Sequence, residues 1–458
     1  MSVRAVVLAA GRGKRMNSDL PKVLFEVAGR PLVSWVVDAV VAAGVDDVTV
    51  VVGHGADRVA AILPEGAETA LQAEQLGTGH AVTAAVEAMG DVAGDTVLVV
   101  PGDTPLFRPE SLTGLLEAHG AADATLLTAR MPDPTGYGRV IRDGDRVVAN
   151  VDERDATEEP RAIAEVAVTT HAFDGSALTT APADSRNDHA QGEYYLTDAV
   201  AAIAAGGTVG AVAGADPAEV QGVNSLEQLA AVEAAMRSRI LAGWMARGVW
   251  VQDPARTYLD AGVSLEPGAR LYADVHLQGK TSVAAGAEIG PSVFAVDSEI
   301  GPGSRVWYSV LRSAVVGEGA EVGPYASLRP GTVMEAGSKI GTFVETKATT
   351  VGRGSKVPHL SYMGDATIGE DSNIGAGTIT CNYDGYHKHH TTIGDRVRIG
   401  SDTMLVAPVE IGDDGWTGAG SVISRDVSPG ALGVERSQQK EVPGYADRRA
   451  RQADSEGE

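Results

Sequence analysis

The sequence predicts two unlike folded units in one chain: an α/β unit with a Rossmann-like sheet at 1–226, and a left-handed parallel β-helix of hexapeptide repeats at 249–433. Three observations support this prediction. Strand and helix patterns alternate through the first half, aliphatic-Gly pairs recur at multiples of six residues in the second half, and a helical segment at 227–248 joins the two. A polar tail follows at 434–458.

Composition narrows the partners that the chain can bind. The 458 residues carry a formal net charge of -24, which argues against nucleic acid and anionic membranes as partners. The only cysteine is Cys381, so an intrachain disulfide and a multi-cysteine metal site are excluded. No apolar run is long enough to cross a membrane, and the first residues have the pattern of a strand rather than of a signal peptide. We therefore expect a protein of the cytoplasm.

Alternating elements in the first 226 residues predict a doubly wound parallel sheet. Apolar runs of strand length at 3–9, 48–52 and 96–100 are separated by helical patterns at 32–43 and 79–88. This βαβ order places helices on the faces of a parallel sheet. Ligands of such sheets bind at the carboxyl ends of the strands, so we expect the site in the loops at those ends.

The loop after the first strand is rich in glycine and in cations. Gly11 and Gly13 let the backbone approach a ligand, but Met16 stands where the dinucleotide fingerprint needs its third glycine. The Walker pattern is missing as well. The cations near this loop are Arg12, Lys14, Arg15 and Lys22. In so acidic a chain they favour a phosphate site, and a solvated basic surface is the alternative.

Asp103 follows the strand at 96–100 and is a candidate magnesium ligand. Mg²⁺ binds one or two protein carboxylates and completes its shell with phosphate and water, which suits a carboxylate at a strand end. An aspartate that caps a turn or a helix is an equally simple interpretation.

A helix at 227–248 is predicted to connect the two units. Ser225 and Gln228 have the spacing of a capping box at its start, apolar residues follow at helical spacing, and Gly248 ends it. We interpret its apolar stripe as packing that holds the two units apart. The tail after Tyr445 is polar and rich in charge, which predicts disorder.

Hexapeptide repeats predict the β-helix. Val316-Gly317 and Val322-Gly323 lie six residues apart, as do Ile368-Gly369 and Ile374-Gly375. This period predicts short parallel strands stacked coil upon coil, with one aliphatic side chain per face pointing inward. The segment 380–392 breaks the period, and an insertion in a regular solenoid usually carries function or an interface.

Polar residues that the repeat does not need predict a site on this stiff scaffold. His359 is the candidate general base, because imidazole titrates near neutral pH, although a lone histidine is more often structural. Glu345 lies one coil earlier and could orient the imidazole. The candidate phosphate ligands are Arg329, Lys347 and Lys388, and the other polar members of the set are Tyr362, Asn373, Asn382 and Tyr383.

Two alternatives to this catalytic interpretation remain open. His387, His389 and His390 lie close together in the insertion and could hold a metal ion. The β-helix could also be a scaffold that only brings copies of the chain together, without any chemistry of its own.

Several motifs resemble one bacterial enzyme family. In the second half they are SLRPG at 327–331, FVETK at 343–347, HLSYMGDATIGEDSNIGAGTITCNYDG at 359–385 and GSDTMLVAP at 400–408. They resemble the acetyltransferase half of the bifunctional N-acetylglucosamine-1-phosphate uridyltransferase and glucosamine-1-phosphate acetyltransferase. In the first half, LAAGRGKRM at 8–16 with the later Pro-Lys pair resembles sugar-1-phosphate nucleotidyltransferases. QAEQLGTGHA at 72–81 resembles the uridyltransferase half of the same bifunctional family.

The resemblance implies that acetyl-CoA acetylates the amine of glucosamine 1-phosphate. His359 would be the base and Glu345 would hold it. Tyr362 and Asn382 would position the sugar, together with Asn373 and Tyr383, while Arg329, Lys347 and Lys388 would bind its phosphate. The residues on the acetyl-CoA side would be Ser401, Ala419 and Arg436. The family forms homotrimers in which the insertion reaches a neighbouring chain, so we expect a homotrimer.

The resemblance also implies that UTP and N-acetylglucosamine 1-phosphate give UDP-N-acetylglucosamine and pyrophosphate. The nucleotide would contact Leu8, Gly11, Gln72, Gly77 and Thr78, with Arg15 and Lys22 on the phosphates of UTP. Asp103 and Asn224 would bind Mg²⁺, the expected cofactor. Gly138 would offer its backbone to the acetamido group of the sugar. No general base is needed, because the attacking phosphate oxygen is already anionic.

Two departures from the pattern of the family concern this sugar. Asp152 stands where the family has a glutamate, and Ala167 stands where it has an asparagine. We therefore predict either weak binding of N-acetylglucosamine 1-phosphate or a preference for another sugar 1-phosphate, with binding of UTP and Mg²⁺ kept. Replacement contacts from Thr169, Thr170 and His171 are the alternative.

Overall fold

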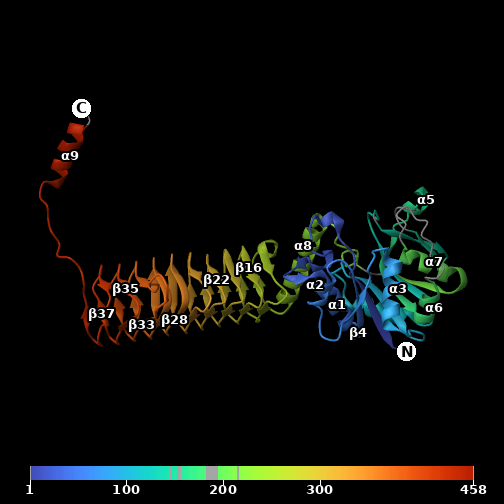
Figure 1. Cartoon of the computed structure of the whole chain (residues 1–458), viewed down its shortest axis with the longest axis horizontal. Helices are drawn as coiled ribbons and strands as arrows, with labels where there is room; N and C mark the ends of the chain where they lie inside the picture. Colours follow the sequence, from blue (N-terminus) through green and yellow to red (C-terminus); the bar gives the residue numbers. More distant parts are fainter. Residues whose placement is uncertain are drawn as a thin grey trace. The chain divides into compact units, whose positions relative to one another are not determined.

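The computed structural model describes residues 2–135, 137–144, 146–151, 156–181, 194–213 and 216–456 (Figure 1). The chain forms two compact units, residues 1–240 and 241–458. The boundary between them falls inside helix α8, Leu226–Ala246. The finer division at 226, 248 and 433 stays a prediction.

The first unit is built on one large sheet. Its main strand order is β11-β7-β10-β6-β1-β4-β5, and the hairpin of β8 and β9 pairs with β10. The strands are β1 Val3–Leu8, β4 Asp47–Val52, β5 Glu68–Leu71, β6 Thr96–Pro101, β7 Ala124–Arg130, β8 Gly138–Asp143, β9 Arg146–Val151, β10 Glu165–Asp174 and β11 Val209–Ala213. A small ribbon pairs β2 Glu26–Val27 with β3 Arg30–Pro31.

The prediction of an entirely parallel sheet is wrong in one respect. Strand β10 runs antiparallel to β6, β7 and β8, and β8 runs antiparallel to β9, whereas the other pairs of the main sheet are parallel. The chain reaches β10 through the β8–β9 hairpin rather than through a long crossover helix, and a hairpin reverses direction.

Helices cover both faces of this sheet, as predicted. Apolar residues of α1 and α4 pack in one buried cluster, and those of α3, α6 and α7 pack in a second cluster on the other side of the sheet. The helices are α1 Leu32–Ala42, α2 Ala56–Ala60, α3 Thr78–Met89, α4 Pro109–His119, α5 Glu158–Arg161, α6 Gly175–Thr180 and α7 Leu196–Gly206. The predicted strands and helices differ from these by a residue or two at their ends.

Helix α8 begins with the predicted cap. Ser225 Oγ accepts a hydrogen bond from Gln228 N at 3.2 Å, which satisfies one free N–H of the first turn. The Gln228 side chain reaches back as a capping box requires, but it accepts from Asn224 N, at 2.7 Å. Val232 and Met236, from the predicted apolar stripe, are 0% and 2% exposed.

The second unit is a parallel β-helix, as the repeat predicted (Figure 1). It runs from β12 Trp250–Val251 to β39 Leu432–Gly433 and contains an 11-stranded and a 17-stranded sheet. The strands around the candidate site are β25 Ser327–Leu328, β27 Lys339–Thr342, β28 Glu345–Val351, β29 Lys356–His359, β30 Tyr362–Ile368, β31 Asn373–Ile374, β32 Ile379–Cys381, β33 Thr391–Ile393, β34 Arg398–Ile399 and β35 Met404–Val406.

Stacked aliphatic side chains hold the coils together. Val306 pairs with Val322, Val322 with Ile340, and Ile340 with Val357, and all four are 0% exposed. Burying such a side chain contributes roughly 1.5–3 kcal/mol, so each coil is stabilised by its neighbours above and below. This rigid stack fixes the positions of the side chains at its surface.

Two segments depart from the regular coils. The predicted insertion lies between β32 and β33, and both of these strands pair with β30, so the stack continues past it. The tail was expected to be disordered, but Tyr445–Glu456 forms helix α9 with no buried residue. Its sequence contains three Ala and three Arg, which favour helix even without a partner. None of the described helices has the length and apolar character needed to cross a membrane.

Candidate active sites

The glycine loop after β1 brings a cation to the strand ends. Gly13 has a φ of 60°, a conformation that favours glycine, and a Cβ there would lie 2.7 Å from Lys22 Cβ. Lys22 therefore packs directly against the loop. Arg15 lies in the short helix Lys14–Met16 and is exposed, as is Gly11. Leu8, the last residue of β1, is partly buried.

Lys22, Asp103 and Asn224 meet at the carboxyl end of the sheet, although they are far apart in the sequence. Lys22 Nζ forms an ion pair with Asp103 Oδ2 and donates to Asn224 Oδ1 at 3.0 Å. The side chains of Lys22 and Asp103 are each 15% exposed. The carboxylate and the amide oxygen thus converge on one cation, here the ammonium group. Hard oxygen ligands around one cation position fit Mg²⁺.

The residues predicted to hold the nucleoside lie at the start of α3. Gln72 is 3% exposed, and its Nε2 donates to Gly77 O at 3.0 Å. Gly77 has a φ of 107° and precedes the helix. Thr78 Oγ1 accepts from Leu196 N at 3.0 Å, which ties the start of α3 to the start of α7. The sheet and two helices therefore preorganise this part of the site.

The residues predicted to contact the sugar lie on neighbouring strands. Gly138 of β8 pairs with Ala167 of β10. Ala167 is 6% exposed and belongs to the same apolar cluster as Ala10, with Leu8 packed against it. Thr170 and His171 are almost completely buried, and burial lowers the pKa of His171 to about 4. Asp152 lies outside the described residues.

The second site is built where consecutive coils of the β-helix stack. Glu345 pairs with Tyr362 in β30, and His359 pairs with Thr342. Arg329 Nη1 forms a 2.8 Å ion pair with Glu345 Oε1, and this bond raises the pKa of Arg329. No hydrogen bond joins Glu345 to His359 in the described part of the chain. His359 is exposed on its strand.

Asp365 joins three residues of the predicted site. Lys347 Nζ lies 3.2 Å from Asp365 Oδ1, and Asn382 Nδ2 donates to Asp365 Oδ2. Burial raises the pKa of Asp365, but the bonds from Asn382 and Lys347 outweigh it and lower the pKa overall. Lys388 lies beside Lys347, and the side-chain hydrogen bond between them, followed by the charge of Lys347, lowers the pKa of Lys388. The three cations Arg329, Lys347 and Lys388 face two carboxylates, Glu345 and Asp365, which leaves one excess positive charge for a phosphate.

Gly364 brings Tyr362 and Asn382 together. A Cβ at Gly364 would collide with Tyr362 Oη and would lie 2.7 Å from Asn382 Nδ2. The phenol and the amide thus converge over a backbone without a side chain. Both groups can donate and accept hydrogen bonds, so this position suits a sugar hydroxyl.

The insertion folds back on itself through Asp384. Asp384 Oδ1 accepts from Tyr386 N at 2.7 Å and His387 N at 2.6 Å, and His389 Nε2 lies 2.7 Å from Oδ2. These bonds, first that from His387 N, lower the pKa of Asp384 to about 2. An isolated bridge pairs Tyr383 with Lys388, which places Lys388 at the site.

The alternative of a metal held by the three histidines of the insertion finds no support. His389 pairs with Asp384, and His390 Nε2 lies 3.0 Å from Thr367 Oγ1. The described residues contain no group of three or more His, Cys, Asp or Glu that could hold a metal ion.

The predicted acetyl-CoA residues lie on successive coils. Asn373 pairs with Arg398 in the next coil. Ser401 O accepts from Gly420 N at 2.8 Å, and Arg436 Nη1 donates to Ala419 O at 3.1 Å. A Cβ at Gly400 would lie 2.6 Å from Ala419 N. Ser401, Ala419 and Arg436 thus form one continuous strip, whereas Asn373 lies on the coil before it.

Known proteins resemble this chain along its length. Residues 5–168 match the model of the MobA-like NTP transferase domain. Bifunctional protein GlmU of Streptomyces avermitilis is 48% identical over 452 residues, which span 97% of this chain and 94% of that protein. The protein of the same name from Desulfitobacterium hafniense strain Y51 is 45% identical, spanning 96% of this chain and 98% of that protein. The one from Kineococcus radiotolerans is 49% identical, spanning 96% and 91%.

The chain belongs to the bifunctional GlmU family. Its membership confirms the predicted enzyme, which has one uridylyltransferase and one acetyltransferase activity. It also excludes the alternative of a scaffold without catalysis.

Two polar residues near the predicted sites were missed by the sequence analysis. Asp365 stands within a quoted motif, but nothing in a sequence shows that an aspartate faces two lysines from other coils. Asn150 of β9 was also missed: it lies over Gly138, and its Oδ1 has no partner among the described residues. A polar residue in an otherwise apolar strand was the available signal.

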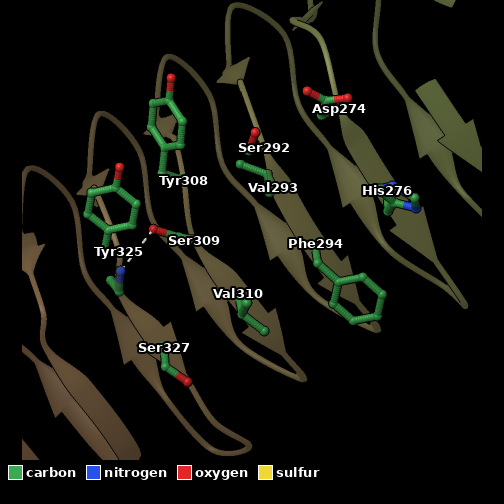
Figure 2. A pocket seen from close by; sticks show the side chains of 11 residues that line it. Asp274, His276, Ser292, Val293, Phe294, Tyr308, Ser309, Val310, Tyr325 and Ser327 are labelled. Atoms are coloured by element: carbon green, nitrogen blue, oxygen red, sulfur yellow. Dashed lines mark hydrogen bonds between the residues drawn. The ribbon is translucent and has the colours of Figure 1, made fainter. Parts of the chain in front are cut away.

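A groove lies on the β-helix of this GlmU chain, outside the residues predicted for either site (Figure 2). Its volume is about 510 Å³, and Tyr308 and Tyr325 stand side by side on its rim. The exposed rings of Tyr308, Tyr325 and Phe343 follow one another on successive coils, with centroids 5.6 Å apart at each step. Leu360, 60% exposed, continues this corner column next to His359.

Proposed function

We propose that the β-helix acetylates glucosamine 1-phosphate and that the α/β unit then couples the product to UTP, giving UDP-N-acetylglucosamine and pyrophosphate. The clustering of Arg329, Lys347 and Lys388 is the observation that carries the first step. It supports a phosphate site on the coils next to the one that carries His359.

In the acetyl transfer, His359 takes a proton from the ammonium group of the bound sugar. The free amine attacks the thioester carbonyl of acetyl-CoA, the C–S bond breaks, and the coenzyme A thiolate leaves and is protonated. Arg329, Lys347 and Lys388 hold the phosphate, while Tyr362 and Asn382 orient the sugar, with Asn373 and Tyr383 beside them. Ser401, Ala419 and Arg436 hold acetyl-CoA. Orientation of His359 by Glu345 stays a prediction, because Glu345 has Arg329 as its partner.

In the uridylyl transfer, a phosphate oxygen of N-acetylglucosamine 1-phosphate attacks the α-phosphorus of UTP, and pyrophosphate leaves. Positioning and charge neutralisation suffice, because the nucleophile is already anionic. Leu8, Gly11, Gln72, Gly77 and Thr78 hold the nucleotide, and Arg15 and Lys22 neutralise its phosphates. Asp103 and Asn224 would hold Mg²⁺, which neutralises phosphate charge when bound. Lys22 is then free to move from these oxygens to a phosphate.

A homotrimer is part of the proposal. The exposed column of Tyr308, Tyr325, Phe343 and Leu360 is an apolar strip that leads to His359. Contiguous exposed apolar residues are typical of interaction surfaces. A neighbouring copy packed on this strip would lie close to the catalytic histidine. The cytoplasm is the proposed compartment, because UTP and acetyl-CoA are intracellular metabolites.

Ala167 favours a second candidate, a uridylyltransferase with altered sugar preference. An alanine cannot form the side-chain hydrogen bond of the asparagine that the family has there. The loss of one hydrogen bond weakens affinity roughly two- to tenfold. The test is the KM of each sugar 1-phosphate in the native protein and in the Asp152→Glu, Ala167→Asn double variant. Unchanged constants in that variant would contradict a role for these positions.

The two half-reactions test the main proposal separately. Purified protein is given glucosamine 1-phosphate with acetyl-CoA, or N-acetylglucosamine 1-phosphate with UTP and Mg²⁺. We expect free thiol in the first mixture and pyrophosphate in the second. Absence of either product would overturn the corresponding half of the proposal.

A further inference from the structure

The side-chain amide of Asn150 is a buried polar group that the proposed mechanism does not use. The residue is 7% exposed, and its Oδ1 has no hydrogen-bond partner among the described residues. Leaving a buried acceptor unpaired costs folding free energy that an apolar side chain of similar size would not cost. A group of this kind is a candidate for binding a ligand.

Asn150 lies on the same face of the sheet as the two residues predicted to contact the sugar. It pairs with Val140, which lies two residues after Gly138 in β8, and Gly138 pairs with Ala167. Residues two apart in a strand, and residues opposite each other, share a face. A Cβ at Gly138 would lie 2.7 Å from Asn150 Oδ1, so the amide lies directly over the Gly138 backbone.

This face adjoins the reacting end of the nucleotide site. Leu8, the last residue of β1, packs against the same apolar cluster as Ala167. Ala167 shares an apolar cluster with Ala10, which lies in the loop after β1. A sugar attached to the attacking phosphate would therefore meet the face that carries Gly138, Ala167 and Asn150.

We propose that Asn150 is a specificity-determining residue of the uridylyl transfer, and that its Oδ1 accepts a hydrogen bond from the acetamido N–H or a hydroxyl of the sugar 1-phosphate. This inference rests on the proposed function. Neither Gly138 nor Ala167 has a side chain that can form such a bond. Thr170 Oγ1 and His171 Nδ1 are likewise buried without a partner among the described residues, but only Asn150 Oδ1 lies over the Gly138 backbone.

The test compares Asn150→Leu, which keeps the branched shape and removes the amide, with the native protein. The KM of N-acetylglucosamine 1-phosphate in pyrophosphate release should rise roughly two- to tenfold, the effect of one lost hydrogen bond. The KM of UTP should stay within about twofold. The melting temperature without ligands should stay the same or rise, because an unpaired buried acceptor is gone.

Two controls accompany this variant. Thr49 in β4 is 1% exposed, and its hydroxyl also has no partner among the described residues, so Thr49→Val removes a matched buried polar group away from the sugar. It should leave both KM values unchanged. Asn150→Ala provides a second variant if Asn150→Leu does not fold, and acetyl transfer by the same sample reports on folding of the rest of the chain.

The outcomes separate the inference from the proposed function. If the KM rises for N-acetylglucosamine 1-phosphate alone, the acetamido N–H is the group that donates to Asn150. If the KM rises for glucose 1-phosphate as well, the donor is a hydroxyl group of the sugar. An unchanged sugar KM in both Asn150 variants, or an equal rise for sugar and UTP, would overturn the inference. Absence of pyrophosphate release by the native protein with any sugar 1-phosphate would instead overturn the proposed function.

Discussion

His359 is an exposed residue on a rigid strand, which suits a base that must meet a bound substrate. We predict that His359→Ala lowers coenzyme A release roughly 10²–10⁴-fold, the usual contribution of a general base. Pyrophosphate release should not change, because the α/β unit has its own site. Lys356→Ala, three residues earlier in β29, is the matched control. Acetyl transfer near the native rate in the His359 variant would exclude this residue as the base.

Lys347 and Lys388 give the phosphate site a pH dependence. The side-chain hydrogen bond with Lys347, and then the charge of Lys347, lower the pKa of Lys388, so Lys388 loses its proton at a lower pH than an ordinary lysine. The KM of glucosamine 1-phosphate should therefore rise as pH rises through this lowered pKa. The Lys347→Met variant lacks the interaction between the two lysines, so the pH at which its KM rises should be higher than in the native protein. Its KM should also be larger at every pH, because one phosphate ligand is missing. A pH profile with the same midpoint in both proteins would contradict this coupling.

The sequence could predict the residue types at the two sites but not all their partners. The motifs identified His359, Lys347 and Asn382, because those polar residues interrupt a regular repeat. They did not predict that Arg329 pairs with Glu345, since both are exposed and the pairing depends on where the side chains lie between coils. The Asp365 contacts were missed for the same reason.

The insertion is the element on which the acetyltransferase site depends most. Asp384 holds it closed, so Asp384→Ala should raise the KM of glucosamine 1-phosphate severalfold, with a smaller effect on acetyl-CoA. Asp253 also accepts from two backbone N–H groups, two and three residues later, so Asp253→Ala is the matched control. Equal effects of the two variants would contradict a specific role for Asp384.

The same aspartate should make the folded insertion less stable at low pH. The pKa of Asp384 is about 2, below the value of 3.8 for a free aspartate. The bonds of the ionised carboxylate therefore stabilise the folded loop fully at pH values above 3.8, the pKa of the free group. This contribution is lost as pH falls from about 4 towards 2. Amide-proton exchange at Tyr386 and His387 should accelerate in that window beyond the intrinsic effect of pH. Protection that is identical in Asp384→Ala would argue against it.

Element types were easier to predict than strand directions. The hexapeptide period indicated the β-helix because the repeat is the packing pattern itself, as the buried column at Val306, Val322 and Ile340 shows. The antiparallel β10 could not be predicted from its apolar composition, because direction depends on the connection that precedes it. Helix α9 was missed because charge was weighed more heavily than helix propensity.

At the scale of the whole molecule, only one of the two activities should need a metal. Chelation of Mg²⁺ should abolish pyrophosphate release, because Asp103 and Asn224 offer oxygen ligands to a single cation. Acetyl transfer should continue, since its proposed chemistry uses His359 as a general base and needs no metal. Equal sensitivity of both reactions to chelator would contradict this division.

Self-association should be required for one activity and not for the other. Tyr325→Asp and Phe343→Asp place charge in the exposed aromatic column, so they should shift the mass measured by light scattering from trimer to monomer. Acetyl transfer should fall with the loss of the trimer, while pyrophosphate release persists. Asp substitution at Trp250, 48% exposed and outside both the column and the insertion, is the control for added charge. A native monomer with full acetyl activity would contradict the assembly.

The strand pairing of the β-helix shows how extra peptide can be inserted into it. Thr257 pairs with Val275 and Thr342 pairs with His359, whereas Asn373 pairs with Arg398 across a longer interval that contains the insertion. Ile374 still stacks on Ile399, so the extra chain leaves the stacking intact. Corners of this solenoid therefore accept foreign peptide without loss of alignment, and grafted epitopes or binding loops could be displayed at chosen heights along one rigid rod.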